Sequence, residues 1–177
     1  MRNNNGGFSL LELIVVITII AILAVAVMPL FKGRETRLQA KEFVAKLNLL
    51  MQTSWQQALV SGNVQKVHFN FKKKIVELFE IKDGSDVRLK GDIVETEMAI
   101  PEAYFFRSFY IDGKDEIALH SKAATVYFFI ASSGVTQAVI INVIDQGNSQ
   151  ESVPLKFGLV LNPFSAQFEY YDTFQKP

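Results

Sequence analysis

The chain has 177 residues, with 18 basic and 18 acidic side chains and no cysteine. This length fits one ordinary domain with an added segment, and the balanced charge argues against a nucleic-acid-binding protein, which usually carries a basic excess. Without cysteine the chain has no disulfide framework, no thiolate zinc site and no cysteine nucleophile. The hydrophobic fraction of 49% is near average, but the apolar residues are unevenly distributed along the chain.

The first predicted element is an apolar helix near the N-terminus. Between Leu13 and Phe31 only Thr18 and Pro29 are not apolar. As a helix this segment is about 28 Å long, close to the roughly 30 Å hydrocarbon core of a bilayer. A soluble domain of this size has no place for a helix that is apolar on all sides. We therefore predict a membrane-inserted helix, with Arg2 and the terminal amine keeping residues 1–7 in the cytoplasm.

Two interpretations of this segment compete. In one it is a secretory signal that is cleaved after Ala24-Val25-Ala26, and in the other the helix stays with the protein. Glu12 favours the second, because a charge in a membrane segment costs about 2.5–3.5 kcal/mol on insertion scales and a disposable signal gains nothing from that cost. The plain alternative is that Glu12 lies among the lipid headgroups, where the cost is small.

The residues around Glu12 carry a resemblance to a known family. Gly7-Phe8-Ser9-Leu10-Leu11-Glu12-Leu13, followed by the apolar helix, resembles the N-terminus of type IV pilins and pseudopilins. The resemblance implies that residues 1–7 are a leader ending at Gly7. It also implies that a prepilin peptidase cuts before Phe8 and methylates the new amine, and that Glu12 directs subunit assembly. Pro29 is similar to a helix-interrupting proline in many of these stems.

The charge on Glu12 also has a physical role that can be stated separately. After cleavage, the amine of Phe8 in one subunit can pair with the Glu12 carboxylate of a neighbour in a low-dielectric environment, where their attraction far exceeds that in water. Removing one partner of a buried pair costs about 3–5 kcal/mol, so this pair would set the register between helices. Pro29 removes a backbone donor and clashes with the carbonyl of Val25. The resulting kink would either let the stems pack in a filament or simply mark the end of the membrane span.

Residues 32–62 continue as an amphipathic stem helix. Apolar and small residues recur at spacings of three and four, at Phe43, Leu47, Leu50, Met51, Ser54 and Ala58. Charged and polar residues, Gln52 among them, fill the remaining faces, and Gly62-Asn63 is a helix stop. The stripe predicts packing against a domain, with Trp55 as a core anchor.

Residues 63–177 form a predicted β-rich domain. Alternating patterns bounded by turn residues predict strands over 67–71, 75–81, 103–111, 117–120, 125–131, 138–144, 155–161 and 167–171, and leave 86–102 ambiguous. The fold class is therefore α+β, a long N-terminal helix packed on an antiparallel β-sheet or β-sandwich. The segments Val126–Phe129, Ser133–Thr136, Val139–Ile141 and Asn162-Pro163 are similar to the GspH/FimT pseudopilin group. Phe164-Ser165-Ala166 stands where that group usually has Thr-Gly.

No motif in the chain indicates chemistry. His68 and His120 are the only imidazoles and lie on separate predicted strands, and no metalloprotease, nucleophile-elbow or phosphate-loop motif occurs. The segments 83–86 and 112–115 lack the full oxygen series of a calcium loop and favour ordinary turns. We expect no enzyme activity, no metal and no cofactor.

The combined reading is a non-enzymatic minor pseudopilin, a subunit of a type II secretion pseudopilus that helps to move folded proteins across the outer membrane. The resemblance implies a single-pass inner-membrane protein with residues 8–31 as transmembrane and assembly helix, and with 63–177 in the periplasm before it enters a filament. The implied partners are major and minor pseudopilins, the prepilin peptidase and methyltransferase, the inner-membrane assembly platform and membrane lipid, with no nucleic acid.

Three alternatives remain open at this point. They are a minor pilin of a type IV pilus, a single-pass membrane-anchored periplasmic binding protein, and a secreted domain with a cleaved signal. The mature N-terminus separates a pilin-like protein, an anchored protein and a secreted domain, because these would begin at Phe8, Met1 and Val27 respectively.

Overall fold

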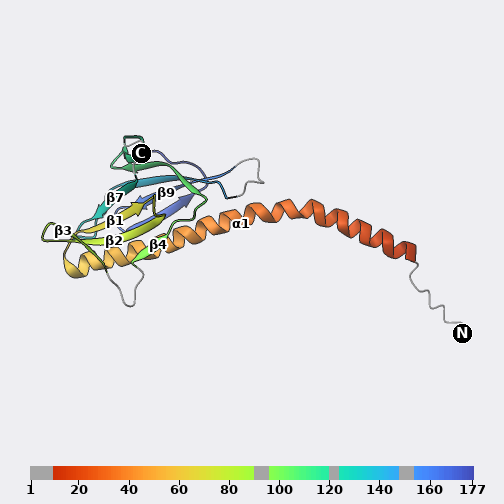
Figure 1. Cartoon of the computed structure of the whole chain (residues 1–177), viewed down its shortest axis with the longest axis horizontal. Coiled ribbons are helices and arrows are strands. Elements are labelled where there is room, and N and C mark those ends of the chain that lie inside the picture. Colours follow the sequence, from red (N-terminus) through yellow and green to blue (C-terminus); the bar gives the residue numbers. More distant parts are fainter. Residues whose placement is uncertain (1–9, 90–95, 120–123, 148–153) are drawn as a thin grey trace, which may run out of the picture. The chain divides into compact units, whose positions relative to one another are not determined.

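The computed structural model describes residues 10–89, 96–119, 124–147 and 154–177, without the side chains of residues 25–36 (Figure 1). The chain forms two compact units, Met1–Leu38 and Gln39–Pro177. The second unit holds two antiparallel sheets and the C-terminal part of the long helix. This arrangement is α+β, as the sequence predicts, with two facing sheets rather than one.

The long helix α1 runs from Leu10 to Ser61. Its C-terminal part buries the predicted stripe, because Phe43, Leu47, Leu50, Met51, Ser54 and Ala58 are all at most 4% exposed. The helix ends at the predicted stop, where Gly62 has a φ of +68° and donates its N–H to the carbonyl of Ala58 at 3.0 Å. A left-handed residue of this kind closes a helix at low cost when it is glycine.

In the described residues, ten strands and a short helix follow α1. They are β1 (Gln65–Asn70), β2 (Ile75–Lys82), β3 (Ser85–Arg88), β4 (Glu97–Ala99), β5 (Tyr104–Ile111), β6 (Lys114–Asp115), α2 (Glu116–Leu119), β7 (Thr125–Ile130), β8 (Val139–Asp145), β9 (Leu155–Asn162) and β10 (Gln167–Tyr171). The first sheet has the order β3-β2-β1-β7 with β4 also paired to β2, and the second has the order β10-β9-β8-β5-β6. The ambiguous region 86–102 thus supplies most of β3 and all of β4.

The core lies between the sheets and the C-terminal part of α1. Phe69 of β1 packs edge-on against Phe109 of β5, with ring centroids 5.1 Å apart, which joins the two sheets. Phe43 of α1 packs edge-on against Tyr104 of β5 at 5.2 Å, which joins the helix to the second sheet. Edge-to-face aromatic pairs of this kind add about 0.5–1.5 kcal/mol beyond their buried area.

The predicted strand over residues 117–120 is wrong. Residues Glu116–Leu119 form the helix α2, and His120 lies outside the described residues. The Oδ1 atom of Asp115 accepts the main-chain N–H groups of Ile117 at 3.1 Å and Ala118 at 3.4 Å. A carboxylate in this position caps a helix N-terminus and satisfies donors that have no partner within the helix.

Candidate functional site

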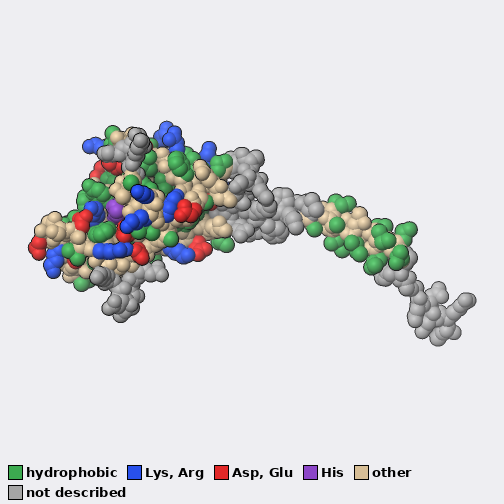
Figure 2. Space-filling view, viewed as in Figure 1, with side chains coloured by type: hydrophobic (Ala, Val, Ile, Leu, Met, Phe, Trp, Pro, Cys, Tyr) green, Lys and Arg blue, Asp and Glu red, His purple; other side chains and the backbone are tan. Residues whose placement is uncertain are grey.

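The N-terminal part of α1 exposes apolar side chains on all sides. Every side chain from Leu10 to Leu23 is exposed, and the large apolar ones range from 45% exposed for Val16 to 78% for Leu10. Hydrophobic side chains cover this part of the helix in Figure 2, whereas charged side chains are spread over the β domain. A helix of this kind needs an apolar environment that the described residues of its own chain do not provide.

Polar groups are few on this segment, and two can be placed. Glu12 lies in the first turn of α1, where the exposed N–H groups and the helix dipole favour a carboxylate. The hydroxyl of Thr18 donates to the carbonyl of Ile14 at 2.7 Å, so the helix itself satisfies this group. The Thr18 hydroxyl is bonded within the helix and therefore needs no outside partner. The segment suits an apolar environment that offers a charged partner to the carboxylate of Glu12 at its start.

The other predicted site residues of this segment are less completely described. Gly7 and Phe8 lie outside the described residues, and α1 is assigned through Pro29, whose side chain also lies outside them. The kink at Pro29 therefore stays a prediction. Over the part of the chain that the structure describes, no helix meets the length and hydropathy criteria for a membrane span. The predicted span includes residues 25–31, whose side chains are not described.

Two amide side chains attach α1 to the second sheet. Asn48 accepts the main-chain N–H of Phe168 at 2.7 Å and donates to the carbonyl of the same residue at 3.0 Å. Gln52, one turn later, donates to the carbonyl of Ser165 at 2.7 Å. Asn48 thus pairs with β10 as a neighbouring strand would. Gln52 is half-buried and lies beside the buried stripe, on one of the faces predicted to carry polar residues, and its bond to Ser165 is a contact that the spacing alone does not predict.

Both segments weighed as calcium loops, 83–86 and 112–115, lie within the described residues and contain hairpin turns. Asp83-Gly84 and Asp112-Gly113 are two-residue hairpin turns in which both residues have positive φ. The carboxylate of Asp112 accepts the Gln137 amide at 2.8 Å and the N–H of Ala138 at 3.1 Å. It therefore bonds within the fold, as a turn residue does.

His68 belongs to a charged cluster on the first sheet. Its Nδ1 atom lies 3.6 Å from the carboxylate of Glu77, which also receives Arg88 at 2.9 Å, and Arg88 further contacts Glu97. Glu77 is almost fully buried, so the adjacent guanidinium offsets the cost of burying its charge. Within the described ranges no group of three His, Cys, Asp or Glu residues could hold a metal ion.

A groove of about 400 Å³ lies beside β7. Its lining comprises Ile111, Glu116, Ala124, Thr125, Val126, Tyr127, Phe129 and Gln137. The titratable side chains of this lining are the carboxylate of Glu116 and the phenol of Tyr127.

Comparison with known proteins bears on both the N-terminal segment and the fold. Residues 2–28, which contain Gly7, Phe8 and Glu12, match the family model of the prokaryotic N-terminal methylation motif. No curated protein sequence matches the chain significantly.

Among solved structures, the chain is similar to the minor pseudopilin EpsH from the Type 2 Secretion System of Vibrio cholerae, with a TM-score of 0.51 and 14% identity over 81% of this chain and 99% of that one. A crystal structure also described as that pseudopilin gives a TM-score of 0.49 and 13% identity, over 76% of this chain and 93% of that one. The predicted resemblance is therefore confirmed, in that an N-terminal methylation motif precedes a pilin-like fold.

Proposed function

We propose that this chain is a minor pseudopilin, a structural subunit of a type II secretion pseudopilus, and not an enzyme. The observation that carries the proposal is the N-terminal part of α1, apolar and exposed on all sides with one carboxylate in its first turn. Lipid covers such a helix before assembly, and the helices of neighbouring subunits cover it afterwards. The methylation motif over residues 2–28 supports this proposal, because the proposed junction between Gly7 and Phe8 lies within the matched residues.

The proposed processing makes Glu12 useful. Cleavage between Gly7 and Phe8 would create a positive amine four residues before Glu12, about 6 Å along a helix. In a bundle of such helices, the amine of one subunit pairs with the Glu12 carboxylate of the next, and each charge reduces the desolvation cost of the other. The leader remains on the cytoplasmic side and the β domain lies in the periplasm, with the prepilin peptidase and the assembly platform as membrane partners.

The choice of a pseudopilus over a type IV pilus rests on the similarity to EpsH, whose published description places it in a Type 2 Secretion System. A subunit of this type would help to push folded proteins through an outer-membrane channel. The anchored binding-protein alternative is disfavoured, because it gives no reason for a methylation motif.

The mature N-terminus tests the processing step. When the gene is expressed with the prepilin peptidase of its host, mass spectrometry should find a chain of 170 residues (177 − 7) that begins with N-methylated Phe8. Replacing Gly7 by a bulky residue should leave the leader attached. A mature chain that begins at Met1 or Val27 contradicts the proposal.

Glu12→Ala tests assembly separately from insertion. The variant should be cleaved and should enter the membrane at least as well as the wild type, because the segment becomes more apolar. Cross-linking to other pilin-like subunits and secretion should fall. The matched control is Thr18→Val, which removes the polar group that the helix already satisfies and should leave cross-linking unchanged. Full wild-type cross-linking and secretion in Glu12→Ala would remove the assembly role of Glu12.

A further inference from the structure

Three segments far apart in the sequence meet beside the last turns of α1. They are residues 47–65 of α1 and the start of β1, residues 131–138 between β7 and β8, and residues 162–168 around the turn from β9 to β10. The N–H of Thr136 donates to the carbonyl of Pro163 at 2.9 Å, and Gln52 reaches the carbonyl of Ser165 at 2.7 Å. Gly134 lies against Trp55, since a Cβ at Gly134 would be 2.8 Å from the indole Nε1.

None of the residues in these three segments is charged, although 20% of the whole chain is. We call this surface the uncharged end. Charged side chains contact its margin: the carboxylate of Glu80 accepts the Asn63 amide at 3.0 Å, and the carboxylate of Asp112 accepts the Gln137 amide at 2.8 Å. The bond from Asn63 holds the pKa of Glu80 below its ordinary value, so the carboxylate stays charged at the margin. An uncharged centre with a charged margin is the usual anatomy of a protein interface.

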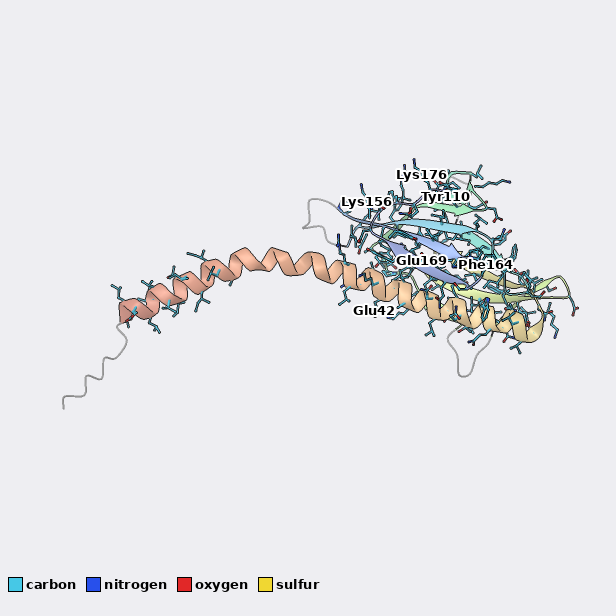
Figure 3. All side chains as sticks on the ribbon, turned by 180° about the vertical axis from the view of Figure 1, so that it is seen from behind. Glu42, Tyr110, Lys156, Phe164, Glu169 and Lys176 are labelled. Atoms are coloured by element: carbon cyan, nitrogen blue, oxygen red, sulfur yellow. The ribbon has the colours of Figure 1, made fainter. Side chains whose placement is uncertain are left out.

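The uncharged end also exposes large apolar side chains. Val60 is 84% exposed, Phe164 is 77% exposed, and Leu59 and Val135 are 45% and 43% exposed. In Figure 3, Phe164 lies beside the C-terminal part of α1, whereas Lys156 lies at the other end of the second sheet. Trp55, the single tryptophan, is half-buried among them. Groups of large exposed apolar side chains on soluble domains are a feature of interaction sites.

The charge pattern determines which partner fits. A charged group pressed against this surface would lose its water and find no counter-ion among the three segments, which is costly. The partner surface must therefore be uncharged and apolar. Under the proposed function the contact belongs to an open filament. Open filaments are built from heterologous contacts, in which a surface meets a different surface of the next subunit and not a copy of itself.

We infer that the uncharged end docks an uncharged apolar surface of another pilin-like subunit in the same filament, an inference that rests on the proposed function. Phe164 and Val60 provide the most exposed apolar area, and aromatic anchors usually carry a large share of interface energy. Phe164 occupies the turn that departs from the GspH/FimT pattern, so this anchor would distinguish the chain from other members of that group.

The test uses the full-length mature chain in detergent micelles. Because the chain has no cysteine, Ser133→Cys adds a single site for an environment-sensitive dye within the uncharged end. The probes are the other pilin-like subunits of the same host, each purified in the same detergent and titrated separately. One of them should shift the dye emission in a saturable way.

Two variants and one matched control are then compared in the labelled chain. Phe164→Asp and Val60→Lys each place a charge in the surface and should weaken binding at least tenfold. A cation in the last helical turn interacts favourably with the helix dipole, so Val60→Lys should leave the fold intact. The control is Phe105→Asp, an equally large change at a side chain that is 52% exposed. Phe105 pairs with Ile144, which pairs with Lys156, at the opposite end of β9 from the turn.

Each result decides the inference. Tenfold weaker binding in both surface variants, with normal binding in Phe105→Asp and unchanged thermal unfolding in all three, supports it. It is overturned if no subunit shifts the emission, if both surface variants bind within twofold of the wild type, or if Phe105→Asp binds as weakly. A shift on adding an unlabelled second copy also overturns it, because the occupant would then be the chain itself. If Phe8 is the mature terminus and Glu12→Ala blocks cross-linking while the surface variants bind normally, only this inference fails.

Discussion

The contact between Asn48 and β10 allows a stability prediction with a magnitude. In Asn48→Ala both main-chain groups of Phe168 lose their partner, and Phe168 is only 3% exposed, so water replaces the amide poorly. A net hydrogen bond contributes about 0.5–1.5 kcal/mol, and leaving a buried group unpaired costs about 1–3 kcal/mol. With partial access of water at this sheet edge, we expect a loss of about 2–3 kcal/mol in the free energy of unfolding. The attachment of α1 to β10 should be less stable by the same amount.

Urea unfolding of a fragment that begins at Lys32 measures this loss. Gln52→Ala is the graded control, because it removes one hydrogen bond to the turn at Ser165 and should cost about 0.5–1.5 kcal/mol. Asn48→Asp keeps an acceptor for the N–H of Phe168 but turns a second oxygen toward its carbonyl. The folded state should therefore raise the pKa of the new carboxyl, since protonation restores a donor.

The sign of the pH dependence follows from that shift. A raised folded-state pKa means that the contribution of the protonated carboxyl is present at low pH and disappears as the pH rises through the folded value. Asn48→Asp should thus lose more stability relative to the wild type at pH 7 than at pH 3. The reasoning is refuted if Asn48→Ala costs less than about 0.5 kcal/mol, or if Asn48→Asp equals the wild type at pH 7.

Three further outcomes are expected. Gly134→Ala should lower the free energy of unfolding by about 2–4 kcal/mol and change the fluorescence emission of Trp55, because the new Cβ stands at a φ of +84° and 2.8 Å from the indole nitrogen. A urea midpoint equal to that of the wild type would contradict this. Burial, helped by the carboxylate of Asp145, raises the pKa of the Tyr104 hydroxyl above its ordinary value of 10.0. The unfolded chain releases that proton from about pH 10 while the folded chain keeps it, so the free energy of unfolding should fall as the pH rises past 10. Tyr104→Phe should make this fall less steep. An unchanged slope in the variant would exclude Tyr104 as the source of the fall. The fragment from Lys32 should be soluble and unfold in one cooperative transition, and aggregation in mild buffer would show that the membrane segment extends further than predicted.

Several features could be derived from the sequence because each depends on neighbouring residues. The buried face of α1 follows the spacing of Phe43, Leu47 and Met51, since a helix brings every third and fourth residue to one side. The hairpin turns at Asp83-Gly84 and Asp112-Gly113 were readable because few residues adopt positive φ. The N-terminal motif could also be recognised from the sequence, because one short continuous segment carries all its residues.

The fold corrected one local prediction and added contacts that no local pattern contains. Residues 117–120 were predicted as a short strand, but the side chain of Asp115 accepts the N–H groups of Ile117 and Ala118 and so caps a helix there, and Ala118 and Leu119 are good helix formers. Periodicity assigns Gln52 to a polar face of α1, but it does not indicate that this face meets the turn at Ser165, because it separates polar from apolar residues without saying what lies beside a half-buried position.

The contact between Asn48 and β10 and the composition of the uncharged end could be determined only from the tertiary structure. Asn48 and Phe168 are 120 residues apart, and they meet because β10 is the edge strand against which the stem helix packs. The uncharged end assembles from three segments whose lack of charge is unremarkable in each one alone. Hydrophobic periodicity specifies which side of a helix or strand is buried, but the hydrophobic effect is non-directional and does not select the neighbour. The neighbour is selected by strand register and by hydrogen-bond donors and acceptors that meet only after the layers have packed.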